Sequence, residues 1–99
     1  MTKQELVTRM QDAGAWLPGK RVKLDFGGDG TIMLDGAASQ VSEDDGDADT
    51  TIKVGWDDWQ AMAAGQLDGM TAFMTGKLKV EGDMSNAMQL QGVLAKLKG

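Results

Sequence analysis

The stretch FMTGKLKVEGDM, residues 73–84, changes its hydrophobic period twice and so predicts parts of three elements in succession. Residues 77–81 alternate between charged and apolar side chains, as expected for a strand with one buried face. A short helix over residues 68–75 precedes this strand, and a longer helix is predicted over residues 84–96. The order of short helix, strand and helix defines the C-terminal half of the fold.

The sequence upstream of this stretch predicts two more helices and four more strands. Thr2 and Glu5 form a T-x-x-E capping box, which marks a helix start. The GGDG run at residues 27–30 favours a tight hairpin, because its residues tolerate a positive φ. The two predicted helices run from the capping box at Thr2 to about Ala13 and over residues 56–64. The four predicted strands lie at 21–26, around Ile32 and Leu34, at 38–42 and at 50–54.

The predicted strands share one apolar and one charged face, which indicates a sheet covered by helices on one side and wet on the other. A chain of 99 residues accommodates one core, so we expect a single domain over residues 1–99. The fold class is α/β (α+β), a two-layer sandwich with a five-stranded sheet. Because helices separate the fourth strand from the fifth, the fifth need not pair with the fourth and is free to enter beside an earlier strand.

Composition argues against several classes of function. A net charge of -5 disfavours nucleic acid as a partner, since that surface needs clustered lysine and arginine. The absence of cysteine and histidine excludes thiolate chemistry and histidine-based triads, so we expect no enzyme, no cofactor and no bound metal. An enzyme that uses Asp, Glu or Lys is left as a weak alternative. The N-terminus lacks a signal-peptide pattern and no apolar run reaches about 20 residues, which predicts a cytoplasmic protein.

The acidic run at residues 43–49 has some features of a calcium-binding loop. Its alternating aspartates would fill the first ligand positions of an EF-hand. However, Thr50 stands where the glycine of that motif belongs, and Trp56 stands where its final glutamate belongs. We therefore expect a solvated turn.

The C-terminal half is rich in methionine at helical spacing. Methionine is unbranched and polarizable, so a wall built from it adapts to ligands of different shape. The simpler interpretation is ordinary core, and spacing alone does not decide between the two. Trp59 at a cavity mouth and the polar Gln91 on the buried face could each contact the head of an amphiphile. The methionine and aromatic side chains at helical spacing in this half are Trp56, Trp59, Met62, Met70, Phe73, Met74, Met84 and Met88.

Four segments together resemble the sterol carrier protein type 2 family, whose members are also called non-specific lipid-transfer proteins. They are DADTTIKV at 47–54, WDDW at 56–59, GQLDGMTAFMTGKLKVEGDM at 65–84 and AMQLQ at 87–91. The resemblance implies a five-stranded, largely antiparallel sheet with helices on one face. It also implies a hydrophobic tunnel between the layers for fatty acyl chains, sterols or other lipids. The short first helix and the early end of the chain leave room for a more open pocket or for closure by a second subunit.

We therefore predict non-enzymatic binding and transfer of a fatty acid, a fatty acyl-CoA or a sterol-like amphiphile. The alternative is a structural or dimerisation module of the same fold without a ligand. The protein is expected to be a monomer or a homodimer with transient membrane contact. The residues predicted to line the lipid cavity are Phe26, Ile32, Leu34, Trp59, Met62, Met70, Phe73, Met74, Met84, Met88, Gln91 and Leu94.

Overall fold

The computed structural model describes residues 2–94 and contains four α-helices, one 3₁₀ turn and five strands. The helices are α1 (Lys3–Ala13), α2 (Trp56–Ala63), α3 (Gly69–Met74) and α4 (Met84–Leu94), and the turn η1 spans Gly27–Asp29. The strands are β1 (Arg21–Asp25), β2 (Thr31–Asp35), β3 (Gln40–Ser42), β4 (Thr50–Val54) and β5 (Leu78–Gly82). Every predicted element is present, with small differences at the ends. The predicted end of α4 near Lys96 lies outside the described residues.

Strand β3 begins two residues later than predicted, at Gln40 and not at Ala38. The carboxylate of Asp35 is the reason, because its Oδ1 accepts the backbone N–H groups of Ala37 and Ala38, each at 3.0 Å. Ser39 completes the turn with a positive φ of 52°. Ala38 and Ser39 therefore belong to the turn, although alternation alone assigns them to the strand.

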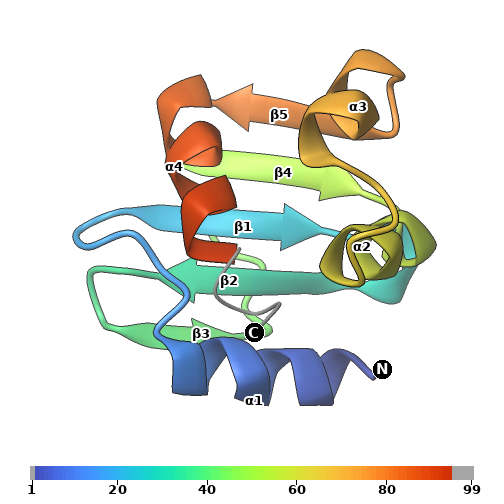
Figure 1. Cartoon of the computed structure of the whole chain (residues 1–99). Coiled ribbons are helices and arrows are strands. Elements are labelled where there is room, and N and C mark those ends of the chain that lie inside the picture. The colour runs from blue at the N-terminus through green and yellow to red at the C-terminus, as the bar shows by residue number, and fades with distance from the viewer. Residues whose placement is uncertain (1, 95–99) are drawn as a thin grey trace.

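The strands form one sheet in the order β3-β2-β1-β4-β5 (Figure 1). β1 and β4 are parallel and the other neighbours are antiparallel, so the sheet is largely antiparallel, as the resemblance implies. β5 pairs with β4, and the alternative place beside an earlier strand is wrong. Val54 at the end of β4 lies opposite Leu78 at the start of β5. The passage through α2 and α3 thus returns the chain to the end of the sheet that it left, so β5 runs back along β4.

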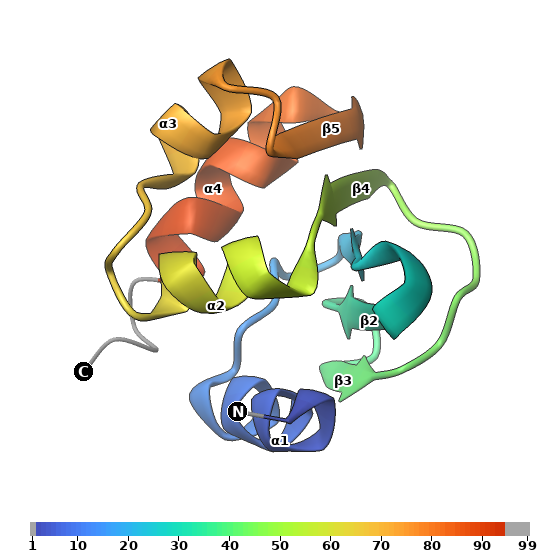
Figure 2. The ribbon, with the colours of Figure 1, turned by 90° about the vertical axis from the view of Figure 1, so that its right-hand side faces the viewer.

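Helices α2, α3 and α4 cover one face of the sheet, and α1 lies beside the edge strand β3 (Figure 2). Gln11 ties α1 to this edge, because its Oε1 accepts the backbone N–H of Val41 at 2.8 Å. Leu6 and Met10 on the same helix are buried with the inward side chains of β1 and β2. None of the helices in the described part of the chain is long and apolar enough to cross a membrane.

The outer face of the sheet is not simply wet, which corrects the expectation from alternation. Met33 in the middle of β2 is fully buried although it faces this side. The acidic loop between β3 and β4 folds over the outer face, where Asp44 pairs with Arg21 at 3.4 Å and Asp45 with Lys23 at 3.2 Å. The acidic run is thus a loop, as predicted, but it is held to β1. Within residues 2–94 no cluster of carboxylates is arranged to hold a metal ion.

Candidate functional site

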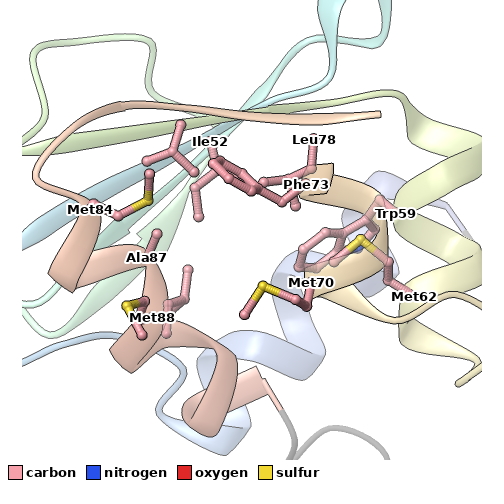
Figure 3. A pocket seen from close by; sticks show the side chains of 11 residues that line it. Ile52, Trp59, Met62, Met70, Phe73, Leu78, Met84, Ala87 and Met88 are labelled. Carbon is pink, nitrogen blue, oxygen red and sulfur yellow. The ribbon is translucent and has the colours of Figure 1, made fainter. Parts of the chain in front are cut away.

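A pocket of about 220 Å³ lies between the β4–β5 end of the sheet and the three helices that cover it (Figure 3). Each of the described lining residues is hydrophobic or aromatic. The lining residues are Ile52, Trp59, Met62, Met70, Phe73, Leu78, Val80, Met84, Ala87, Met88 and Leu90. The pocket therefore offers a ligand apolar contact and little opportunity for hydrogen bonding.

Strand alternation and helical spacing explain how these residues meet. Leu78 and Val80 point to the same face of β5, and Ile52 lies opposite Val80 on β4, so the three form a floor. Each helix contributes residues three or four apart, which lie on one face of that helix. These are Trp59 and Met62 on α2, Met70 and Phe73 on α3, and Met84, Ala87, Met88 and Leu90 on α4.

A buried hydrogen-bond chain fixes α4 above the pocket. Asn86 Nδ2 donates to Thr50 Oγ1 at 3.1 Å, and Thr50 Oγ1 donates to the carbonyl oxygen of Asp83 at 2.8 Å. Thr50 is 1% exposed and Asn86 is 3% exposed, so neither has water as an alternative partner. Because Ala87 follows Asn86 directly, these two hydrogen bonds also determine where the α4 side of the pocket lies.

The carboxylate of Asp83 caps the first turn of α4. Its Oδ1 accepts the hydroxyl of Ser85 at 2.7 Å and the backbone N–H of Ser85 at 2.9 Å. The pKa of Asp83 is lowered from its ordinary value. The hydrogen bond from the Ser85 hydroxyl has the largest effect, the bond from the Ser85 backbone N–H follows, and the positive charge of Lys20 adds a smaller one. The first turn of α4 is thus stabilised by a charged cap.

An aromatic cluster supports Trp59, which lines the pocket from α2. The Phe26 ring lies 5.0 Å from the Trp56 ring in an edge-to-face contact and 5.9 Å from the Trp59 ring. Trp59 is 3% exposed, and its Nε1 has no hydrogen-bond partner. The indole is therefore held by packing alone.

The mouth of the pocket is unusually apolar. Phe73 is 41% exposed, and the exposed fractions of Met84, Met70 and Met88 are 45%, 52% and 64%. These four side chains belong both to the pocket lining and to the surface. The pocket consequently opens to the outside between α3 and α4.

The structure brings together half of the residues predicted for the cavity: Trp59, Met62, Met70, Phe73, Met84 and Met88. It places Phe26, Ile32 and Leu34 elsewhere, because β1 and β2 lie beyond β4 in the sheet and their inward side chains are buried in the core. Met74 is 79% exposed at the end of α3 and is not among the residues that line the pocket. The side chains of Gln91 and Leu94 lie outside the described part of the structure. Contact between any of these residues and a lipid stays a prediction.

The prediction missed five lining residues: Ile52, Leu78, Val80, Ala87 and Leu90. The alternation on β4 and β5 already marked three of them as inward-facing. Only the pairing of β5 with β4 reveals that these two strands, and not β1 and β2, form the floor. Ala87 lies within the predicted last helix, but its small side chain carried no separate signal.

A second, more open groove of about 460 Å³ lies at the ends of β1, β4 and β5, where Asp25, Lys53, Lys77 and Lys79 contribute to its lining. Lys53 Nζ pairs with Glu81 Oε1 at 3.0 Å, and this hydrogen bond together with the charge of Glu81 raises the pKa of Lys53. Lys77 and Lys79 flank Leu78 and so face away from the apolar pocket. The groove is separate from the pocket.

The architecture and the pocket define a two-layer α/β domain built around a hydrophobic space. The chain belongs to the SCP-2 sterol transfer family, whose model matches residues 9–95. Sterol carrier protein 2 from Bos taurus is 38% identical over 61 residues, which make up 62% of this chain and 11% of that protein. The chain thus corresponds to a small part of a much longer relative.

Solved structures share the fold at low sequence identity. The solution structure of Sterol Carrier Protein-2 from Aedes aegypti, in complex with the C16 fatty acid palmitate, has a TM-score of 0.78 at 20% identity, and the match covers 95% of this chain and 94% of that one. A stereoselective inverting sec-alkylsulfatase from Pseudomonas sp. has a TM-score of 0.58 at 22% identity, with 84% of this chain and 14% of that chain covered. The same fold therefore occurs alone and inside a larger enzyme.

Proposed function

We propose that this chain binds a single lipid in the pocket between α2–α4 and β4–β5 and transfers it, without catalysing a reaction. The observation that carries the proposal is the apolar lining, which opens to the surface between α3 and α4. Each methylene that leaves water for such a pocket contributes about 0.8 kcal/mol. The ligand classes are a fatty acid, a fatty acyl-CoA and a sterol-like amphiphile.

The volume of the pocket limits how such a ligand sits. A cavity of about 150 Å³ holds a benzene molecule, so a space of about 220 Å³ accommodates part of a long acyl chain and not all of it. Met84 and Met88 face Met62 and Met70 across the pocket in Figure 3. Because methionine changes rotamer easily, these side chains can move apart and admit a longer chain.

The polar end of the ligand belongs at the mouth. The described lining holds no ionisable group, and the one polar atom of Trp59 is buried. A carboxylate placed inside would lose its hydration without gaining a partner, which is strongly unfavourable. A contact between the lipid head group and Gln91 of α4 belongs to the same proposal.

Two further observations support a lipid carrier. The Aedes aegypti protein of the same fold was solved with palmitate, and the bovine relative is named as a sterol carrier. The described lining has no Asp, Glu or Lys that could act as an acid or base, which supports a role in binding and not in catalysis. A cytoplasmic location and a monomeric or dimeric state belong to the same proposal.

The second candidate is a structural or dimerisation module. It is favoured by the exposed rim of the pocket, which a partner domain could cover, and by the occurrence of the fold as a small part of an alkylsulfatase. In that case the rim would be buried in the assembly and the pocket would take no lipid.

Native mass spectrometry of delipidated protein distinguishes the two candidates. The protein is mixed in turn with palmitate, palmitoyl-CoA and cholesterol. A lipid carrier gives a mass increase of one ligand per chain with at least one of them. A folded protein that takes up none of the three, and that forms a dimer instead, would contradict lipid binding and favour the module.

A further inference from the structure

All large hydrophobic side chains that are exposed in the described part of the chain lie on two helices. Met70, Phe73 and Met74 are on α3, and Met84 and Met88 are on α4; we call these five residues the α3/α4 patch. With about 200 Å² for a fully exposed large side chain, exposures from 41% to 79% leave roughly 500–600 Å² of apolar surface. A surface patch of this size often marks an interaction site.

The α3/α4 patch is also free of charge. Neither α3 nor α4 contains a charged residue within its bounds, in a chain that is 25% charged. The acidic loop between β3 and β4 lies on the opposite side of the sheet, where it pairs with Arg21 and Lys23 (Figure 2). An apolar partner therefore reaches α3 and α4 without desolvating a charge on either helix.

The relation of the patch to the pocket selects the partner. Its apolar area alone does not, because a dimer interface of about 800 Å² per partner is only a little more than half apolar. A second copy would cover the mouth, since four of the five patch residues line the pocket. A bilayer covers the same residues and still lets an acyl chain pass from membrane to pocket without crossing water.

We infer that the α3/α4 patch docks on the surface of a zwitterionic phospholipid bilayer, with the mouth of the pocket against the membrane. The inference rests on the proposed function, because the membrane is the source of the lipid. The patch carries no charge and the whole chain carries -5, so apolar burial drives docking and attraction to anionic lipid does not.

Met74 allows docking to be tested separately from ligand uptake. It is the most exposed member of the patch, at 79%, and it does not line the pocket. The Met74→Gln variant is compared with the wild-type chain and with Ala13→Gln, which places the same side chain on an exposed position of α1. The assay is flotation of delipidated protein with phosphatidylcholine vesicles, with and without added phosphatidylglycerol, at low and high salt.

The inference predicts that the wild-type chain and Ala13→Gln float equally with phosphatidylcholine vesicles, with no dependence on salt or on phosphatidylglycerol. Met74→Gln should bind these vesicles about fivefold more weakly. Equal flotation of Met74→Gln and wild type, or binding that needs phosphatidylglycerol and disappears at high salt, would overturn the inference. So would a wild-type dimer that Met74→Gln converts to a monomer, because a second copy would then be the occupant.

Uptake of palmitate without vesicles tells the two possible failures apart. If wild-type protein takes up palmitate but does not float with phosphatidylcholine vesicles, the docking inference is wrong and the proposed function stands. If it takes up no lipid in solution, the proposed function fails whatever the vesicles show. Met74→Gln should match wild type in palmitate uptake, because Met74 lies outside the pocket lining.

Discussion

Asn86 on α4 donates a hydrogen bond of 3.1 Å from its Nδ2 to Oγ1 of Thr50, the first residue of β4. Both residues are almost fully buried, at 3% exposure for Asn86 and 1% for Thr50. The bond joins the helix that carries one wall of the pocket to a strand that carries the floor. The pocket is therefore shaped by a polar contact that itself lies outside its lining.

The Thr50→Val variant should destabilise the fold, because valine keeps the shape of threonine and removes the hydroxyl. The amide of Asn86 would then be buried without this partner, which costs about 1–3 kcal/mol in the free energy of unfolding. Urea denaturation measures this cost. Thr50→Ser is the control, since serine keeps the hydroxyl, and it should lose clearly less. A valine variant as stable as the serine variant would show that the bond contributes nothing.

Gly76 precedes β5 and Gly82 is the last residue of β5. Substitutions at these two glycines test how closely the chain approaches β4 at Gly82. Gly82 has a φ of 90°, and a Cβ at this position would meet the backbone carbonyl oxygen of Asp49. Gly76 has a φ of 81°, but a Cβ there would meet open space. Gly76→Ala should therefore cost about 1–2 kcal/mol for its backbone conformation alone. Gly82→Ala should cost about 3 kcal/mol or more, because a steric clash adds to the strain.

Thermal or urea unfolding of the two glycine variants gives the comparison directly. Equal losses at the two positions would mean that β4 and β5 separate easily, and that Gly82 serves only the turn before α4. A larger loss at Gly82 is the result expected from the register, in which Gly82 lies opposite Thr50.

Asp83 makes the stability of α4 depend on acid pH. Its pKa is lowered in the folded chain, mainly by the hydroxyl of Ser85 and then by the amide of Ser85. A lowered pKa means that the stabilisation is present above the ordinary pKa of about 3.8 and is lost as the pH falls through the lower, folded value. Urea midpoints measured from neutral to acid pH should fall less steeply in Asp83→Asn than in the wild-type chain. The slope for Ser85→Ala should lie between the slopes of these two proteins. Parallel curves for all three proteins would contradict this role.

Trp59 should report the arrival of a ligand, because it lines the pocket and is buried among apolar side chains. A shift in tryptophan emission is expected when palmitate is added to the delipidated protein. Trp59→Phe should remove most of that shift. Trp16→Phe is the control, since Trp16 packs on the core away from the lining, and it should keep the shift. If Trp59→Phe keeps it too, the ligand does not reach this wall.

Local patterns in the sequence predicted the elements and their inward faces. The alternation of Leu78 and Val80 predicted a strand and the side it buries, and the capping box at Thr2 predicted the start of α1. These signals are local because they depend on neighbours within one turn or one strand. The family resemblance added the largely antiparallel sheet, which the strand pairing confirms.

Contacts between distant segments could not be predicted in the same way. Phe26, Ile32 and Leu34 have the same inward pattern as Leu78, and only the strand order shows that they lie in the core beyond the pocket. Thr50 and Asn86 look like surface residues in the sequence, and their burial follows from the docking of α4 on β4. The attachment of the acidic loop to Arg21 and Lys23 likewise depends on where the loop crosses the sheet.

Titration of palmitate into delipidated protein, for the wild-type chain and for Ala87→Phe, tests whether the lipid binds in the pocket between the helices and the sheet. Ala87 is 8% exposed and lines the pocket, so a phenyl ring at this position fills the space that an acyl chain would take. Circular dichroism checks that the variant is folded. If the lipid lies in this pocket, the wild-type chain binds one palmitate, and the variant has an affinity at least about tenfold lower, which corresponds to about 1.4 kcal/mol. A folded Ala87→Phe protein that binds palmitate as tightly as wild type would contradict this placement, because the lipid would then lie somewhere other than between the helices and the sheet.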